Sequence, residues 1–256
     1  MDYVILGKSN LLVSRTAFGA MTLDRVDSQE SVNALVKQAY DDGVNFFDTS
    51  VSTLESERRL GEAIQSLGIR NDVVLATKTA ARSSDEIDED INRSLCNLKV
   101  DYIDLYQLEN SHKLPLLDGP DRIMEKLLNL KESGLIRHFG IVTENLDVAL
   151  SMLSSDVQWE TVQFPFNMLC PVEIENVVKD FYNKNIGFIA MRPLCGGIVT
   201  NIPLALGYLR QFDSAVPVWG VENSEQLQQI LYFTQNPPNI DEKFMREVEE
   251  QRDFFN

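Results

Sequence analysis

The 256-residue chain is poor in cysteine, histidine and basic residues. Its three cysteines, Cys96, Cys170 and Cys195, show no CxxC spacing, which argues against a disulfide framework or a zinc site. The two histidines, His112 and His138, have no spaced set of carboxylates with them, so we expect no metal. Lysine and arginine total 23 against 39 acidic residues, and the net charge of −16 argues against a nucleic-acid partner, because such binding needs basic residues.

Long apolar runs are also absent. No stretch reaches the roughly 18 apolar residues of a membrane span, and the first residues lack the charged and then apolar pattern of a signal peptide. We therefore expect a cytoplasmic protein with no membrane partner. No repeat, low-complexity tract or linker divides the chain, which predicts one domain over residues 1–256, and the oligomeric state is left open.

Eight short apolar or β-branched runs recur along the chain, each followed by a segment with helical periodicity. Eight such units predict an α/β fold, a single (β/α)8 barrel of the TIM type. Helices are expected at Ser28–Tyr40 and Asp85–Cys96, from Asn223 onward, and at Asn239–Phe255, the last one packed on the outside. The predicted strands are Arg15–Gly19, Val44–Asp48, Val73–Lys78, Ile103–Gln107, Phe139–Thr143, Val162–Pro165, Gly187–Met191 and Val216–Val221.

The segment from Gly43 to Thr79, GVNFFDTSVSTLESERRLGEAIQSLGIRNDVVLATKT, carries the most specific motifs. It resembles the catalytic segment of the aldo/keto reductase family through Asp48-Thr49 after an apolar strand, Ser56-Glu57, Leu60-Gly61 and Thr77-Lys78. The later run YIDLYQ, at 102–107, resembles the family's third-strand signature. The resemblance covers most of the chain and implies an aldo/keto reductase-like barrel. The family's long cofactor loop is shortened here to 196–203.

The resemblance implies a catalytic tetrad, of which only part is present. In the family a nicotinamide delivers hydride to a carbonyl and a tyrosine donates the proton, assisted by a lysine and an aspartate. Asp48 and Lys78 match the last two, whereas Thr53 stands at the tyrosine position and Glu109 at the histidine position. An aliphatic hydroxyl is a far weaker acid than a phenol, whose pKa is about 10, so Thr53 can only form hydrogen bonds. Glu109 is the candidate general acid or base.

The cofactor contacts implied by the resemblance are mixed. Gln163 matches the glutamine that holds the nicotinamide carboxamide, Gly19 the entry beside the ribose, and Gly220 the phosphate turn. Glu222 stands where a lysine or arginine usually meets the 2′-phosphate, which disfavours NADPH, although a carboxylate can bond the ribose hydroxyls of NADH. Ile230 replaces the asparagine expected near the adenine. Two outcomes stay open, no cofactor or NAD(P)H.

Two further residues are candidates for a small-molecule substrate. Arg192, at a strand end, either grips a carboxylate or phosphate or pairs with an acidic loop residue, and His112 could turn into the barrel mouth. The favoured hypothesis is non-redox acid/base chemistry, of the isomerase, lyase or cyclase type, on a carbonyl or imine metabolite through Lys78, Asp48 and Glu109. The alternatives are a divergent NAD(P)H-dependent carbonyl or double-bond oxidoreductase and a non-catalytic binding or regulatory barrel.

Overall fold

The strands of the protein form a closed parallel barrel, as predicted. The computed structural model describes residues 1–109 and 112–255, with residue 54 described by its backbone alone. Within this part of the chain eight strands pair in sequence order, and the last pairs back with the first. Each overlaps one of the eight predicted runs. They are β3 (Ala17–Gly19), β4 (Phe46–Asp48), β5 (Val74–Thr79), β6 (Ile103–Glu109), β7 (Ile136–Val142), β8 (Thr161–Pro165), β9 (Gly187–Met191) and β10 (Ala215–Gly220).

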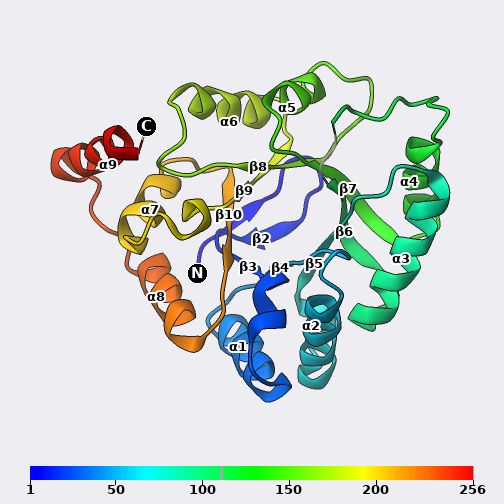
Figure 1. Cartoon of the computed structure of the whole chain (residues 1–256), viewed down its shortest axis with the longest axis horizontal. Coiled ribbons are helices and arrows are strands. Elements are labelled where there is room, and N and C mark those ends of the chain that lie inside the picture. Colours follow the sequence, from blue (N-terminus) through cyan, green and yellow to red (C-terminus); the bar gives the residue numbers. More distant parts are fainter. Residues whose placement is uncertain (110–111, 256) are drawn as a thin grey trace.

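Helices surround the barrel (Figure 1). The predicted starts are confirmed where a polar side chain caps the helix: Ser28 accepts from the Ser31 amide before α1, and Asn223 accepts from the Gln226 amide before α8. The elements are η1 (Ala20–Arg25), α1 (Gln29–Asp41), α2 (Leu54–Leu67), η2 (Arg70–Asp72), α3 (Ser84–Leu98), α4 (Ile123–Glu132), α5 (Leu146–Met152), α6 (Glu173–Asn183), η3 (Cys195–Gly197), α7 (Ile202–Arg210), α8 (Ser224–Gln235) and α9 (Glu242–Phe255).

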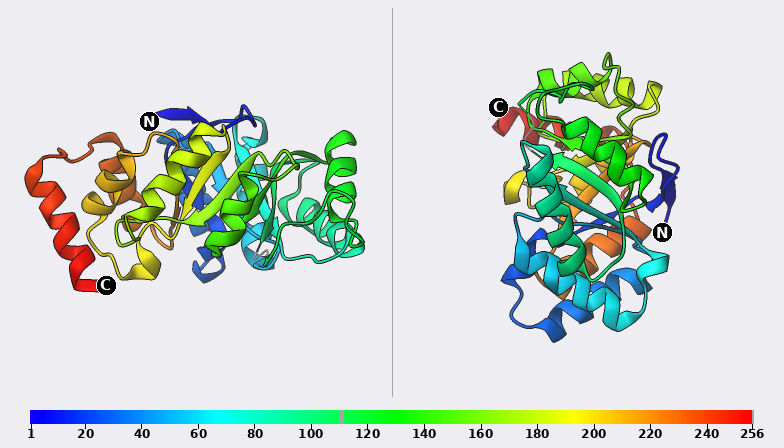
Figure 2. Two further views of the ribbon diagram at one scale, coloured as in Figure 1. Left: turned by 90° about the horizontal axis from the view of Figure 1, so that it is seen from above. Right: turned by 90° about the vertical axis from the view of Figure 1, so that its right-hand side faces the viewer.

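An N-terminal hairpin, which the sequence patterns did not reveal, lies at one end of the barrel. Its strands β1 (Tyr3–Ile5) and β2 (Leu12–Ser14) pair antiparallel and are only three residues long each. Leu6 and Val13 from the hairpin are buried with the inward-facing apolar residues of the barrel strands. Figure 2 shows the hairpin on the outside of that end. The hairpin therefore closes the bottom of the barrel and leaves the opposite end as the mouth.

The last helix, α9, packs on the outside of the barrel, as expected. It contacts α7, and the Phe244 ring lies so close to Gly207 that an added Cβ there would come within 2.7 Å of it. Among the helices described, none has both the length and the apolar character needed to cross a membrane.

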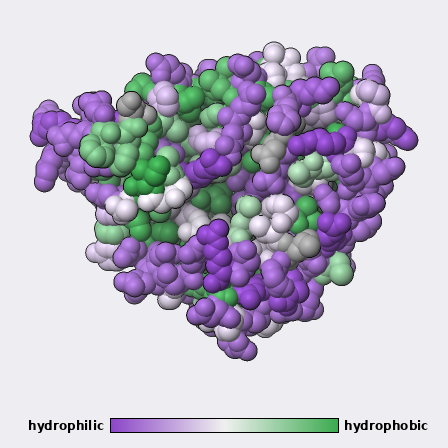
Figure 3. All heavy atoms as spheres, viewed as in Figure 1, coloured by the Kyte–Doolittle hydropathy of each residue, from purple (hydrophilic) through white to green (hydrophobic). Residues whose placement is uncertain are grey.

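Alternation along the strands sorts the barrel interior into layers. Phe46, Ala76 and Leu105 point inward from β4, β5 and β6 and form an apolar layer above the hairpin. Two residues later on the same strands come Asp48, Lys78 and Gln107, which are polar and buried. The residues at the C-terminal strand ends thus form a polar layer at the mouth, where barrel proteins carry their sites. Figure 3 shows a face that is mostly hydrophilic, with a hollow near its middle.

Candidate active site

Asp48 and Lys78 form a buried ion pair below the mouth. The Lys78 ammonium donates to Asp48 Oδ2 at 2.7 Å and to the backbone oxygen of Thr49 at 2.6 Å. Each side chain is only 2 % exposed. The structure therefore brings these two predicted residues together, but it leaves the lysine ammonium little surface with which to touch a ligand.

Two glutamine side chains extend this pair across the barrel. Gln163 Nε2 donates to Asp48 Oδ2 at 3.1 Å, and Gln163 Oε1 accepts from Gln107 Nε2 at 2.8 Å. Both ends of the Gln163 amide are therefore engaged within the protein, and the residue is 2 % exposed. To hold a carboxamide, Gln163 would have to exchange one of these bonds for a bond to the ligand.

The pair leaves one polar atom unsatisfied. Within the described residues, Asp48 Oδ1 is buried and has no hydrogen-bond donor, and the same holds for the hydroxyl of neighbouring Thr49. Buried polar atoms without partners are uncommon in proteins and call for an explanation such as a bound water or ligand. The polar layer can accordingly accept a hydrogen bond from a bound molecule.

Glu109 ends β6 and is the partly exposed acid of the mouth. The Ser50 hydroxyl, fully buried, donates to Glu109 Oε2 at 3.1 Å and shares a 2.8 Å hydrogen bond with the hydroxyl of Ser52, which is exposed. Ser50 thus fixes one carboxyl oxygen of Glu109 and connects it through Ser52 to solvent. Thr53 lies nearby at the start of α2, where its hydroxyl donates to the Ser50 backbone oxygen at 2.9 Å.

A groove of about 790 Å³ opens beside the mouth, at the ends of β9 and β10. Glu222 lies in its wall and pairs with Arg25, from η1, at 2.8 Å. Gly220 is exposed, and an added Cβ there would meet only Thr22, at 3.4 Å. The groove is lined by Thr22, Arg25, Arg192, Pro193, Leu194, Gly196, Gly197, Val199, Thr200, Ile202, Val218, Trp219, Gly220, Glu222, Gln226 and Ile230.

Gly19 is required by the packing of two strands. It pairs with Gly220 between β3 and β10, and an added Cβ would lie 2.9 Å from the Trp219 backbone oxygen. Such a contact is too close for any side chain, so the two strands can approach only with glycine at this position. Its expected place beside a ribose stays a prediction.

Arg192 and His112 lie apart from each other. Arg192 follows β9 and pairs with Glu144, so the second of its two expected arrangements is the one in the structure. His112 lines a separate cleft behind the ends of β5 and β6. His138 is remote from the mouth, and its Nδ1 lies 2.6 Å from Glu160.

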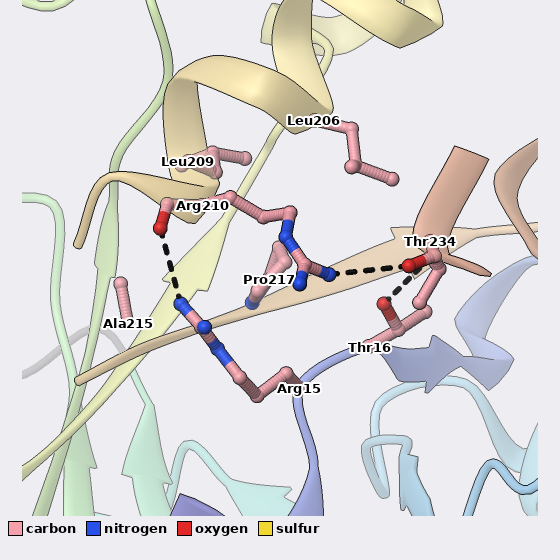
Figure 4. Close-up of a pocket in the computed structure, with 8 residues that line it drawn as sticks. All are labelled: Arg15, Thr16, Leu206, Leu209, Arg210, Ala215, Pro217 and Thr234. Carbon is pink, nitrogen blue, oxygen red and sulfur yellow. Dashed lines mark hydrogen bonds between the residues drawn. The ribbon is translucent and has the colours of Figure 1, made fainter. Parts of the chain in front are cut away.

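One further cavity is too small for a ligand. A cavity of only about 10 Å³ lies near the start of β3 and β10, where Arg15 reaches the Arg210 backbone oxygen and Arg210 reaches that of Thr234 (Figure 4). This is room for about one water molecule. Across residues 1–109 and 112–255, no group of His, Cys, Asp and Glu is arranged to hold a metal ion.

Several site residues were not found from the sequence. Ser50 and Gln107 lie next to motif residues but have neutral side chains of common type, and their role depends on contacts 59 and 56 residues away. Arg25 ends η1 and Glu144 lies in a loop, and the partner of each lies far along the chain. No local pattern signals such pairs.

The fold and the polar layer define a TIM-barrel protein with a candidate site at the C-terminal strand ends. Residues 15–203 match the model of the aldo/keto reductase family, and the chain belongs to this family. The sequence resemblance is thereby confirmed.

Curated relatives and solved structures agree with this assignment. The chain is 30 % identical to "Uncharacterized oxidoreductase YqkF" of Bacillus subtilis, over 78 % of this chain and 67 % of the relative. It is 29 % identical to L-galactose dehydrogenase of Arabidopsis thaliana, over 76 % and 66 %. The chain spans about two thirds of the length of these relatives. The aldo-keto reductase AKR11C1 from Bacillus halodurans, in its holo form, shares the fold with a TM-score of 0.83, 22 % identity, and coverage of 98 % of this chain and 96 % of that one.

Proposed function

We propose that the protein is a divergent oxidoreductase that uses NADH to reduce a small carbonyl compound or a conjugated double bond. The observation that carries this proposal is the groove of about 790 Å³ at the C-terminal ends of β9 and β10, on the same side of the barrel as the polar layer. Pockets of this volume hold small molecules and cofactors. Relatives named as oxidoreductases and dehydrogenases support the same reaction class. The preference for non-redox chemistry that the sequence suggested has no such support.

The residues of the groove fit the nucleotide half of a dinucleotide. Gly220 leaves the backbone of the β10–α8 turn open to a phosphate, and Glu222 offers oxygens to the two ribose hydroxyls. Arg25 neutralises Glu222 in part, yet the carboxylate still disfavours a 2′-phosphate next to it. These features favour NADH over NADPH.

At the reacting end the protein must hold the ring and move a proton. A reduced nicotinamide supplies the hydride when it is bound. Gln163 is the residue to hold the carboxamide, and it would exchange its bond to Asp48 for one to the ligand. Hydrogen bonds to charged groups contribute about 1.5–3 kcal/mol, so the bonds to the bound ligand must offset the loss of the bond to the Asp48 carboxylate.

Glu109 is the proposed proton donor. The Thr53 hydroxyl is too weak an acid and already donates to a backbone oxygen. Glu109 lies at the mouth and is partly exposed. Ser50 holds one of its carboxyl oxygens, and the other accepts no hydrogen bond from the described residues. Lys78 and Asp48 lie beneath it, and their burial prevents direct contact with a substrate. They therefore act on the site only through the electric field of their charges.

A second candidate function, acid/base chemistry without hydride, is favoured by one observation. The Gln163 amide is satisfied inside the protein, as expected for a site that binds no nicotinamide. In that case Glu109 would transfer a proton to or from a carbonyl or imine compound.

Steady-state assays separate the two functions. NADH oxidation is followed with a panel of aldehydes, ketones and enones for the wild type and for Glu109→Gln, with Ser66→Ala as a control far along α2 from the mouth. The proposal expects turnover that falls by about 10²-fold or more in Glu109→Gln at unchanged NADH affinity, because general acids contribute roughly 10²- to 10⁴-fold. Turnover that is unchanged in Glu109→Gln would contradict the assigned role.

A further inference from the structure

Two serine hydroxyls connect the Glu109 carboxyl to the surface in one hydrogen-bonded chain. The Ser50 hydroxyl donates to Glu109 Oε2 at 3.1 Å and lies 2.8 Å from the Ser52 hydroxyl. Ser50 is fully buried, Ser52 is exposed, and Glu109 is partly exposed. One oxygen of the proposed proton donor is therefore joined to the surface through two hydroxyl groups.

The direction of this chain follows from a count of protons. A serine hydroxyl has one proton to donate, and Ser50 uses it for Glu109 Oε2. In the 2.8 Å contact between the two serines, the Ser52 hydroxyl must then be the donor and the Ser50 oxygen the acceptor. The backbone amide of Ser52 donates to the same Ser50 oxygen at 3.3 Å. Two donors therefore turn the Ser50 proton toward Glu109.

The turn that carries the two serines is anchored to the barrel. The backbone amides of Thr49 and Val51 each donate to a backbone oxygen of β5, at 2.9 and 3.0 Å. The Ser50 backbone oxygen accepts from the Thr53 amide at 3.0 Å and from the Thr53 hydroxyl at 2.9 Å. These bonds fix the backbone on both sides of Ser50, so its hydroxyl is held at a defined position beside Glu109.

A hydrogen bond to one carboxyl oxygen decides which oxygen carries the acid proton. Because Glu109 Oε2 accepts from Ser50, the proton of the neutral carboxylic acid lies on Oε1, which accepts no hydrogen bond from the described residues. When this proton passes to a substrate, the carboxylate that forms keeps its bond from Ser50. Hydrogen bonds to charged groups are stronger than those to neutral groups, so Ser50 favours the transfer.

We propose that Ser50 and Ser52 are positioning residues for proton transfer by Glu109, since they place its acid proton on Oε1 and stabilise the carboxylate that forms. In the transfer the Oε1–H bond breaks and an O–H bond forms on the substrate oxygen, while each serine keeps its own proton. This role rests on the proposed function, in which Glu109 is the proton donor. Neither serine touches the substrate.

Substitutions of the two serines test this role in the NADH oxidation assay. We expect Ser50→Ala to lower kcat by about tenfold or more at unchanged KM and NADH affinity, because a hydrogen bond to a charged group is lost. At exposed Ser52, where folding is not at risk, valine and threonine have similar size and differ in the hydroxyl. Turnover should fall in Ser52→Val and be largely retained in Ser52→Thr, and Ser66→Ala on α2 is the unaffected control.

A double-mutant cycle with Glu109→Gln separates positioning of the acid from a general effect on the fold. In Glu109→Gln the acid is absent, so adding Ser50→Ala should change the remaining turnover by less than about twofold. The role is overturned if Ser50→Ala lowers turnover equally in both backgrounds, if Ser50→Ala alone matches the wild type, or if Ser52→Val matches Ser52→Thr. Failure of the proposed function is seen in the wild type alone, as no NADH oxidation with any carbonyl compound, and it removes this role as well.

Discussion

Replacing Lys78 with methionine should destabilise the protein strongly. The substitution keeps much of the side-chain volume and removes the charge that Asp48 faces at 2.7 Å. Asp48 would then be a carboxylate 2 % exposed, with Gln163 as the remaining donor to Oδ2 and none to Oδ1 among the described residues. Removing one partner of a buried pair costs about 3–5 kcal/mol, because the other charge stays uncompensated. That is a large fraction of the roughly 5–15 kcal/mol of a typical domain.

Urea denaturation of wild type and variants measures this cost. The double variant Asp48→Asn with Lys78→Met removes both charges, so we expect it to recover about 2 kcal/mol or more of the loss, whereas Lys37→Met on the surface changes stability by less than about 0.5 kcal/mol. A cost of under about 1 kcal/mol for Lys78→Met would refute the reasoning, since it would mean that water reaches the pair. This measurement is also needed to interpret any loss of activity in Lys78→Met, since an unfolded variant would be inactive whatever the role of Lys78.

Three further predictions concern other parts of the barrel. Burial raises the pKa of Glu160, but hydrogen bonds from His138, Lys131 and a backbone amide outweigh it and hold the pKa below its ordinary value. The carboxylate therefore contributes to folding stability above its unfolded pKa of about 4.3, and this contribution is lost as the pH falls through the folded pKa. The difference in urea midpoint between wild type and Glu160→Gln should shrink on acidification. A difference that stays constant down to acid pH would show that the carboxylate does not contribute. Gly140→Ala should lower the melting temperature markedly, because an added Cβ would lie 2.0 Å from the Thr161 hydroxyl and 2.7 Å from its backbone oxygen, and an unchanged melting curve would contradict that packing. Glu222→Arg should shift the ratio of the affinities for NADPH and NADH by about tenfold or more toward NADPH in fluorescence titration, because a charge-assisted bond to the 2′-phosphate replaces repulsion. An unchanged ratio would show that Glu222 does not determine which dinucleotide binds.

The barrel could be predicted from the sequence because its signals are local. Each strand is a short apolar run that ends near a polar or glycine residue, as Phe46–Asp48 does, and helix starts carry capping residues such as Ser28. The N-terminal hairpin was not predicted, since three-residue strands show too little alternation.

The site was predictable only in part. Asp48 and Lys78 follow from motif positions, and strand alternation places both side chains inside the barrel. The engagement of the Gln163 amide by Asp48 and Gln107 was not predictable, because these partners lie 115 and 56 residues away. The pairing of Arg192 with Glu144, 48 residues apart, could be offered only as one of two arrangements.

Titration of the purified wild-type protein with NADH and NADPH, by calorimetry and nicotinamide fluorescence, tests the central claim most directly. The account predicts that NADH binds in the micromolar range and more tightly than NADPH, because the groove offers Glu222 to the ribose hydroxyls. Absence of binding by either dinucleotide at millimolar concentration would contradict the oxidoreductase assignment and favour acid/base chemistry at Glu109 or a binding role for the barrel.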